Sequence, residues 1–233
     1  TGVPVPETLA VCRDIEVNDA PFYVMAYVDG VVLDSPERAE PMSPELRRAA
    51  GEHLIDVLAD LHEVDIDSIG LGDLARREGY IERQVKRWTT QWEKSKTREL
   101  PAIDEVARRL ARNLPEQVGV SIAHGDYRFG NLLVNTGTGR IAAVLDWELC
   151  TLGDVLADVA GMIAYTDDRT TGGTPPPTSV EGFPDADEIR EAYAGHSSRD
   201  LTQLDFYVAF AYWRIACIVE GVYARYAAGV MGD

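Results

Sequence analysis

The feature that most constrains the fold is a group of three short apolar segments in the middle of the chain. They are Val118–Ala123, Leu132–Val134 and Ile141–Leu145, and residues 135–139 (Asn-Thr-Gly-Thr-Gly) between the last two have the composition of a hairpin turn. Short apolar runs bounded by turn residues are typical of β-strands. The flanking sequence has helical periodicity, so we predict a mostly helical body with a few small β elements.

Apolar residues at helical spacing predict helices on both sides of these strands. The predicted helices are Pro44–Val64, Tyr80–Lys96, Ala102–Leu114, Asp154–Tyr165 and Leu201–Ala228, the last being one long helix or two. Nearer the N-terminus, Leu9–Arg13 and Phe22–Tyr27 are predicted to form a hairpin or two neighbouring strands. The segment Asp167–Pro184 is rich in glycine and proline, which indicates a mobile loop.

Composition and charge exclude several classes of protein. The 233 residues include 22 Lys+Arg and 39 Asp+Glu, giving a formal net charge of −17, which disfavours binding to nucleic acid or to an anionic membrane. No apolar run approaches the roughly 20 residues that span a bilayer, and residues 1–6 lack a signal-peptide pattern. The cysteines are three, widely separated and without a C-x-x-C pair. We therefore expect reduced thiols in a cytoplasmic protein.

The residues that carry chemistry lie where two of the central strands end. A strand leads into His124 and Asp126, and Asn131 follows five positions after Asp126, where the next strand begins. A later strand leads into Asp146, within the sequence Val-Leu-Asp-Trp-Glu of residues 144–148. Two β elements that end side by side would bring Asp126, Asn131 and Asp146 together at one rim of the fold.

This trio of residue types suits phosphoryl transfer. A carboxylate can accept the proton of an attacking hydroxyl, while an amide oxygen and a second carboxylate hold Mg²⁺ against nucleotide phosphates. Mg²⁺ prefers such hard oxygen ligands and needs only one or two carboxylates, because phosphate and water complete its coordination. The H-G-D-x-x-x-x-N spacing of residues 124–131 also parallels the H-R-D-x-x-x-x-N catalytic loop of protein kinases.

These motifs resemble those of the aminoglycoside phosphotransferase/choline kinase-like family. The His-Gly-Asp…Asn motif of residues 124–131 and the Leu-Asp-Trp-Glu of residues 145–148 carry the resemblance. The longer string Leu-Asp-Trp-Glu-Leu-Cys-Thr-Leu-Gly-Asp-Val-Leu-Ala-Asp, residues 145–158, is similar to a narrower branch related to the kinase-like domain of acyl-CoA dehydrogenase fusion proteins. Residues 22–30 (Phe-Tyr-Val-Met-Ala-Tyr-Val-Asp-Gly) resemble the hinge between the two lobes of the family's fold.

The resemblance implies an α+β, protein kinase-like fold that consists mainly of the helical C-terminal lobe. Residues 1–30 would then be a remnant of the N-terminal lobe with its hinge. Residues 31–233 would be the C-terminal lobe, with a catalytic loop at 124–131 and a metal-binding loop at 146–154. The implied activity is that of an ATP-dependent phosphotransferase, or kinase, that moves the γ-phosphate to a hydroxyl of a small molecule.

The resemblance also implies roles for individual residues. Asp126 would be the catalytic base, and Asn131 and Asp146 would hold Mg²⁺ and the nucleotide phosphates. Backbone groups in the hinge would contact the adenine of ATP, and two further carboxylates would support the catalytic loop from behind. The hinge residues are Met25, Ala26 and Tyr27, and the supporting carboxylates are Asp154 and Asp158.

One departure from the family pattern concerns the phosphate-binding lobe. Kinase-like enzymes have a glycine-rich loop, a strand lysine and a helix glutamate before the hinge, whereas the lysines of this chain are Lys86, Lys94 and Lys96. We therefore expect a fragment with most of the N-terminal lobe missing, little ATP turnover by this chain alone, and exposed apolar surface that promotes self-association, with a homodimer as one form. The alternative function is a catalytically silent kinase-like module that binds a ligand or a partner.

Several residues keep two interpretations at this stage. His124 is expected to be a hydrogen-bonded scaffold rather than an acid or base, and Glu148 is either near a second Mg²⁺ or a solvated carboxylate. Trp88 and Trp92 fit a packed helix face better than an acceptor pocket, and Arg214 either meets an anionic substrate or lies along the helix surface. Two classes of phosphate acceptor stay open: an acidic pocket would suit aminoglycosides, whereas the narrower branch points to hydroxylated acyl compounds or other metabolites.

Overall fold

The computed structural model describes residues 2–167 and 175–229 of the chain. Its strands are β1 (Thr8–Cys12), β2 (Phe22–Met25), β3 (Ser121–Ala123), β4 (Leu132–Asn135), β5 (Arg140–Val144) and β6 (Thr151–Gly153). Its helices are α1 (Ile15–Asn18), α2 (Pro36–Ala39), α3 (Pro44–His62), α4 (Tyr80–Ser95), α5 (Pro101–Arg112), α6 (Leu156–Thr166), α7 (Ala186–His196) and α8 (Leu204–Ala227). The prediction of a mostly helical α+β fold is confirmed.

The described strands form three antiparallel pairs, β1–β2, β3–β6 and β4–β5. The predicted N-terminal hairpin is present, with the single turn of α1 inserted before its return strand. The β4–β5 hairpin also forms as predicted, and the side chain of Asn135 accepts a hydrogen bond from the amide of Gly137 in its turn. β3 does not pair with either of these strands. Its partner is β6, a three-residue strand that no sequence pattern indicated.

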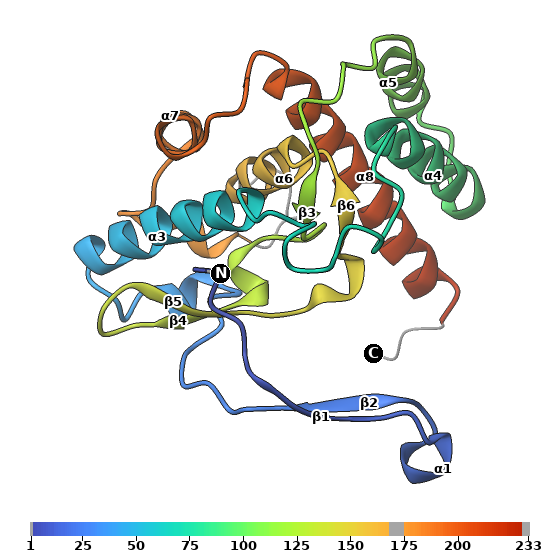
Figure 1. Cartoon of the computed structure of the whole chain (residues 1–233). Coiled ribbons are helices and arrows are strands. Elements are labelled where there is room, and N and C mark those ends of the chain that lie inside the picture. Colours follow the sequence, from blue (N-terminus) through green and yellow to red (C-terminus); the bar gives the residue numbers. More distant parts are fainter. Residues whose placement is uncertain (1, 168–174, 230–233) are drawn as a thin grey trace.

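The helices pack around the two central strand pairs, and α6 and α8 form the middle of the body (Figure 1). The last predicted helix is one continuous helix, α8, which contacts α4, α5 and α6. Tyr207, Phe210 and Trp213 from α8 are buried in the core. The helices α2 and α7 were not predicted, and residues 168–174 of the predicted mobile loop lie outside the described residues.

Helix α8 is also long and apolar enough to pass a test for a membrane-spanning helix. Its best 18-residue window has a mean hydropathy of 1.2. Inside this fold 44% of that window is buried, and the helix contacts three other helices. Core helices of water-soluble domains pass the same test, since burial selects the same apolar residues.

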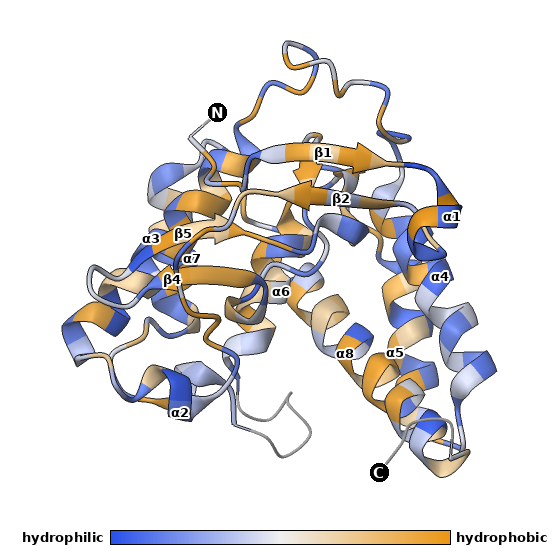
Figure 2. Cartoon of the chain, turned by 90° about the horizontal axis from the view of Figure 1, so that it is seen from below, coloured by the Kyte–Doolittle hydropathy of each residue, from blue (hydrophilic) through white to orange (hydrophobic). Residues whose placement is uncertain are grey.

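The β1–β2 hairpin stands away from the helical body (Figure 1). The chain before it is tied to the body by the bond from the Val144 amide to the Pro4 carbonyl oxygen, 2.9 Å, and the chain after it by two backbone bonds of 2.9 Å between Val31 and Val134. Apolar residues line the strands of the hairpin (Figure 2), and Leu9, Val24 and Met25 are 59%, 45% and 44% exposed. The expected exposed apolar surface is therefore present, and self-association through it stays a prediction.

Candidate active site

The loop of residues 124–131 begins where β3 ends, and a buried carboxylate fixes its first turn. Asp158, in the first turn of α6, is 3% exposed. Its two oxygens accept hydrogen bonds from the backbone amides of His124, at 2.6 Å, and Gly125, at 2.9 Å. Gly125 has a φ of +86°, a conformation that favours glycine. Asp158 therefore supports the loop from behind, as the sequence analysis expected.

The imidazole of His124 joins this loop to the loop that follows β5. The ring is fully buried; its Nδ1 lies 3.3 Å from the amide nitrogen of Asp126, and its Nε2 lies 2.9 Å from the carbonyl oxygen of Leu145. Because an amide donates to Nδ1 and a carbonyl accepts from Nε2, these partners define a neutral ring with its proton on Nε2. His124 is thus a scaffold residue, the interpretation favoured from the sequence.

The carboxylate of Asp126 is held by polar side chains of its own loop. Its Oδ2 accepts hydrogen bonds from Nδ2 of Asn131 at 2.8 Å and from Nε of Arg128 at 3.2 Å. The Asp126 side chain is 19% exposed, so the carboxylate still reaches solvent. Arg128 also stacks over the ring of Tyr165, with 5.4 Å between the guanidinium carbon and the ring centroid.

The β4–β5 hairpin brings Asn131 and Asp146 close together in the fold. Leu132 pairs with Val144, and the amide of Leu145 donates to the carbonyl oxygen of Asn131 at 2.9 Å. Asn131 is 7% exposed, and its Nδ2 donates to both the backbone and the side-chain oxygen of Asp126. This orientation leaves its Oδ1 as the atom that could hold a cation. Asp146 is exposed and adopts a left-handed backbone conformation with φ of 60°.

A second buried network lies behind Asp158. The Nδ1 of His62 lies 2.8 Å from the hydroxyl of Tyr193, and its Nε2 lies 3.5 Å from Asp158. Burial lowers the pKa of His62 below 6.5, against the opposing effect of Asp158. Burial would raise the pKa of Asp158, yet the pKa is lowered, because the contact with His62 and the bond from Gly125 favour the carboxylate. Asp158 is therefore ionised behind the loop.

Asp154, the other predicted supporting carboxylate, anchors different segments. Its Oδ2 accepts from the hydroxyl of Tyr207 on α8 at 2.5 Å and from the amide of Val118 at 3.3 Å, and its Oδ1 accepts from the amide of Leu156 at 3.2 Å. Burial and the neighbouring Asp154 raise the pKa of Tyr207 well above its ordinary value. Asp154 therefore ties the start of α6 to α8 and to the segment that leads into β3.

A cavity of about 800 Å³ lies between the N-terminal hairpin and the loop after β5. Asp146 and Glu148 line it on one side, and Met25 and Tyr23 line it on the other. Of the three predicted hinge residues, only Met25 lines this cavity. The amide of Ala26 donates to the carbonyl oxygen of Glu7 at 2.8 Å, and Tyr27 is 89% exposed.

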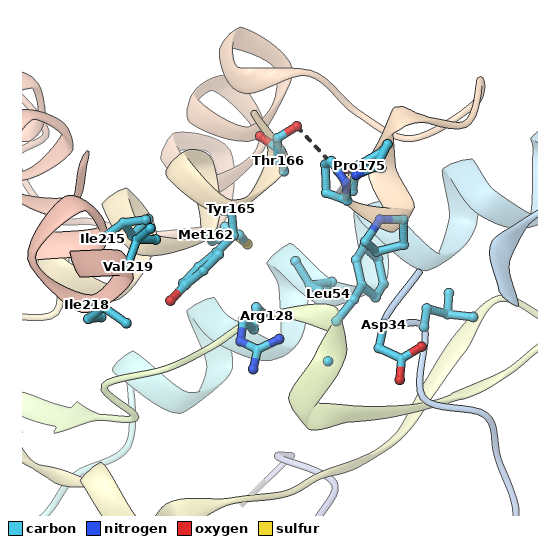
Figure 3. A pocket seen from close by; sticks show the side chains of 16 residues that line it. Asp34, Leu54, Arg128, Met162, Tyr165, Thr166, Pro175, Ile215, Ile218 and Val219 are labelled. Carbon is cyan, nitrogen blue, oxygen red and sulfur yellow. Dashed lines mark hydrogen bonds between the residues drawn. The ribbon is translucent and has the colours of Figure 1, made fainter. Parts of the chain in front are cut away.

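A second cavity, of about 320 Å³, is lined by residues 128–130 of the loop that carries Asp126 and is mostly apolar. In Figure 3, Ile215, Ile218 and Val219 of α8 lie on one side of it and Leu54 lies on the other, with Arg128 between them. Tyr165 also lines it, and burial followed by the charge of Asp126 raises the pKa of its phenol. This cavity therefore opens next to the residues that surround Asp126.

The remaining aromatic and cationic candidates have defined places. Trp92 is 1% exposed and its Nε1 donates to Asp104 at 2.8 Å, so its predicted role in packing is confirmed. Trp88 is half-buried against the core. The side chain of Arg214 makes a contact that neither of its two interpretations included: its Nη2 donates to the carbonyl oxygen of Gly125 at 2.6 Å. Sequence periodicity could not reveal this bond, because 89 residues separate its partners.

Asn131 and Asp146 could together hold a divalent cation. Among the described residues no group of three or more His, Cys, Asp and Glu side chains is arranged to hold a metal. A magnesium site that is completed by nucleotide phosphates does not need such a group. The exposed carboxylate of Asp146 and the Oδ1 of Asn131, joined through the β4–β5 hairpin, fit that kind of site.

Comparison with known proteins places these observations in a family. A family profile described as "Phosphotransferase enzyme family" matches residues 1–207. The chain is 36% identical over 237 residues to acyl-CoA dehydrogenase family member 11 of Gallus gallus, covering 98% of this chain and 30% of that protein. It is 34% identical over 234 residues to acyl-CoA dehydrogenase family member 10 of Mus musculus, covering 98% of this chain and 22% of that protein. The chain thus spans less than a third of these relatives.

Solved structures show the same fold. A crystal structure from Ralstonia eutropha, named for the aminoglycoside phosphotransferases, superposes with a TM-score of 0.87 at 35% identity, covering 100% of this chain and 72% of that one. ADP-bound aminoglycoside phosphotransferase APH(2'')-Ib superposes with a TM-score of 0.58 at 16% identity, covering 95% and 70% of the two chains. The predicted protein kinase-like fold is therefore confirmed.

Proposed function

The chain belongs to the phosphotransferase enzyme family, and from this premise we propose that it transfers the γ-phosphate of ATP to a hydroxyl group of a small molecule. Family and fold indicate a kinase-like phosphotransferase. The proposal adds three assignments. Asp126 is the base for the acceptor hydroxyl, Asn131 and Asp146 hold Mg²⁺, and the cavity beside Asp146 takes the nucleotide.

The observation that carries the proposal is that the loop of Asp126 and the loop of Asp146 line two different cavities. Its carboxylate is fixed by Asn131 and Arg128, and the loop that carries it is fixed by Asp158. The cavity of about 800 Å³ includes Asp146, and the cavity of about 320 Å³ includes Arg128. A phosphate donor in the first and an acceptor in the second would meet at the loop of Asp126.

The reaction then follows from these positions. The acceptor hydroxyl gives its proton to Asp126, its oxygen forms a bond to the γ-phosphorus, and the bond from that phosphorus to the bridging oxygen breaks to release ADP. Bound Mg²⁺ would supply compensation for the negative charge of the phosphates. Asn131 orients the carboxylate of Asp126 through its Nδ2 while its Oδ1 remains for the cation. Catalysis rests mainly on positioning and electrostatics in such reactions.

The lining of the smaller cavity supports an acceptor with an apolar body. Aliphatic and proline side chains line the cavity together with Arg128, and Asp34 lies at one side (Figure 3). A polycation would meet the charge of Arg128 in this space, whereas the apolar body of a hydroxylated chain would displace water from apolar surface. The lining therefore favours the hydroxylated, apolar alternative over a polycationic aminoglycoside, although a structural neighbour, APH(2")-IIa, is described in complex with gentamicin.

The second candidate is a silent kinase-like module that binds nucleotide or a partner. The observation that favours it is the position of the lysines: Lys86 and Lys94 lie on α4 and Lys96 follows it, so none can serve as a strand lysine before the hinge. Nucleotide binding is common to both candidates, and transfer of phosphate separates them.

The test has a binding arm and a transfer arm. ADP is titrated into the 233-residue chain by calorimetry, in Mg²⁺ and in EDTA. We expect tighter binding in Mg²⁺, loss of that difference in Asp146→Asn, and an unchanged difference in Glu116→Gln, which removes an exposed carboxylate elsewhere. Equal binding in Mg²⁺ and EDTA by the unaltered chain would refute the metal site.

The transfer arm measures ADP formation with hydroxylated fatty acids and with aminoglycosides as acceptors. It compares the chain with a version extended at its N-terminus by a glycine-rich, lysine-bearing lobe. We expect turnover in the extended version and little in the shorter one. Asp126→Asn should lower kcat by about 10²–10⁴-fold while Mg²⁺-dependent ADP binding persists. Nucleotide binding without transfer to any acceptor in either version would favour the silent module.

A further inference from the structure

Arg214 holds the backbone just before Asp126 from the far end of the sequence. Its Nη2 donates to the carbonyl oxygen of Gly125 at 2.6 Å. That oxygen belongs to the same peptide unit as the amide nitrogen of Asp126, which lies 3.3 Å from Nδ1 of His124. One planar peptide group is therefore anchored at its oxygen by Arg214 and at its nitrogen by His124.

The anchored peptide unit is the one whose rotation would move Asp126. Gly125 lacks a Cβ and has φ of +86°, so its own preferences restrain the backbone little. The amide of Gly125 is held by Asp158 at 2.9 Å, which fixes the His124–Gly125 peptide unit. The Gly125–Asp126 unit is not fixed by this bond and depends on Arg214 and His124. Without the bond from Arg214, the carbonyl of Gly125 would lose its charged donor, and the carboxylate of Asp126 would sample more orientations.

The guanidinium of Arg214 is itself held in place. Arg214 is half-buried on α8 and lies over the ring of Trp88 on α4, with 5.8 Å between the guanidinium carbon and the ring centroid. A planar guanidinium stacked on an aromatic ring loses little freedom when it donates a further hydrogen bond. Arg87 lies over the same ring at 5.9 Å but is exposed, and no hydrogen bond joins it to residues 124–131 in the described parts of the chain.

We propose that Arg214 is a positioning residue for phosphoryl transfer: it fixes the Gly125–Asp126 peptide unit and thereby aims the Asp126 carboxylate at the acceptor hydroxyl. The proposal rests on the proposed function, because it takes Asp126 as the base. It gives Arg214 a role that neither sequence-based interpretation included. Arg214 directly precedes Ile215 on α8, and Ile215 lines the smaller cavity, so the proposal also links that cavity to the loop of Asp126.

The first measurement needs no activity. Amide hydrogen exchange is followed in the 233-residue chain for a peptide that covers residues 121–131, in Arg214→Ala and in the matched control Arg87→Ala. Both variants remove one arginine from the ring of Trp88, and only Arg214→Ala removes a bond to the loop. We expect exchange in this peptide to rise by about tenfold in Arg214→Ala, the effect of one charged hydrogen bond, and to be unchanged in the control.

The second measurement uses the N-terminally extended version. We expect Arg214→Ala to lower kcat by about 10²-fold, the cost of misplacing a reacting group by about 1 Å, with the KM for ATP nearly unchanged. Arg214→Lys should recover part of the rate, and guanidinium at a concentration below denaturation should raise the rate of Arg214→Ala. A residue that merely stabilises α8 would alter the melting temperature without this split between kcat and KM.

The outcomes separate the two proposals. Equal loop exchange in Arg214→Ala and Arg87→Ala overturns the positioning role, whether or not the protein is an enzyme. Faster loop exchange in Arg214→Ala combined with no transfer by the unaltered extended version supports the anchoring of the loop and refutes the proposed function. Faster loop exchange with an unchanged kcat in an active protein shows that the anchored peptide does not position the base, and it overturns the proposal.

Discussion

Asp158→Asn should be among the most destabilising single substitutions in the protein, although it changes only one oxygen to an NH₂ group. The two carboxylate oxygens accept from the amides of His124, at 2.6 Å, and Gly125, at 2.9 Å, and the side chain is almost fully buried. An asparagine has one carbonyl oxygen, so it can accept from only one of these amides. The other backbone amide would face the NH₂ group of the asparagine, which is also a donor, in a place that water does not reach.

The magnitude follows from these two bonds. Replacing a charged acceptor by a neutral one weakens the retained bond by about 1 kcal/mol, and losing the second bond with its buried donor unpaired costs about 2–3 kcal/mol. The substitution also removes the cost of burying a negative charge, but this gain does not offset the loss. The pKa of Asp158 is lowered in the folded protein, so its favourable contacts already outweigh the cost of burial. We expect a loss of about 3–4 kcal/mol, a large part of the 5–15 kcal/mol typical of a domain.

The assay is urea unfolding followed by tryptophan fluorescence, with the free energy of unfolding obtained by linear extrapolation. Asp73→Asn, which changes an exposed carboxylate, is the matched control and should stay within about 0.5 kcal/mol of the unaltered protein. By thermal unfolding, the Asp158→Asn variant should melt about 10 °C lower, since each kcal/mol shifts a domain of this size by about 2–4 °C. A loss below about 1 kcal/mol would refute the reasoning.

Two further predictions concern buried groups near the same loop. Burial lowers the pKa of His62 below 6.5 in the folded protein. Below pH 6.5 the unfolded chain therefore binds a proton that the folded chain does not. The free energy of unfolding should fall as the pH drops from about 6.5 towards 5, by up to about 1.4 kcal/mol per pH unit. His62→Gln should flatten that slope in urea unfolding, and an unchanged slope would contradict the assignment. Tyr207→Phe removes the only hydroxyl that donates to Asp154 in the described structure, and it should lower the free energy of unfolding by about 1.5–3 kcal/mol in the same assay. Tyr226→Phe, at an exposed site, should lower it little. Equal losses in the two variants would refute this prediction.

The local patterns of the sequence were sufficient for the parts of the fold that depend on local structure. The predicted helix from Pro44 to Val64 is α3, and Ser43 caps it by accepting from the amide of Leu46. The β4–β5 hairpin was predictable from its turn residues, and it places Asn131 beside the loop of Asp146 without help from the rest of the chain. The sequence predicted that Asp126 and Asn131 lie close together, and the structure adds a hydrogen bond between their side chains.

The parts that the sequence could not predict depend on contacts between distant residues. β3 pairs with β6, and three residues such as Thr151–Gly153 are too few to have a periodicity of their own. The two cavities are formed by side chains from separate segments, so no local pattern indicates their size or lining. Arg214 has the ordinary appearance of a cation on a helix, and only the packing of α8 shows that it reaches Gly125.

The anchoring of the loop by α6 and α8 has a consequence for how the chain acquires its site during synthesis. The loop of residues 124–131 leaves the ribosome long before Arg214, its most distant anchor, and contacts of such separation form late because closing a long loop costs chain entropy. The β4–β5 hairpin, whose partners are close in sequence, can form early. A nascent chain would therefore hold its metal-ligand candidates in place first and orient Asp126, its proposed base, only after the last helix docks.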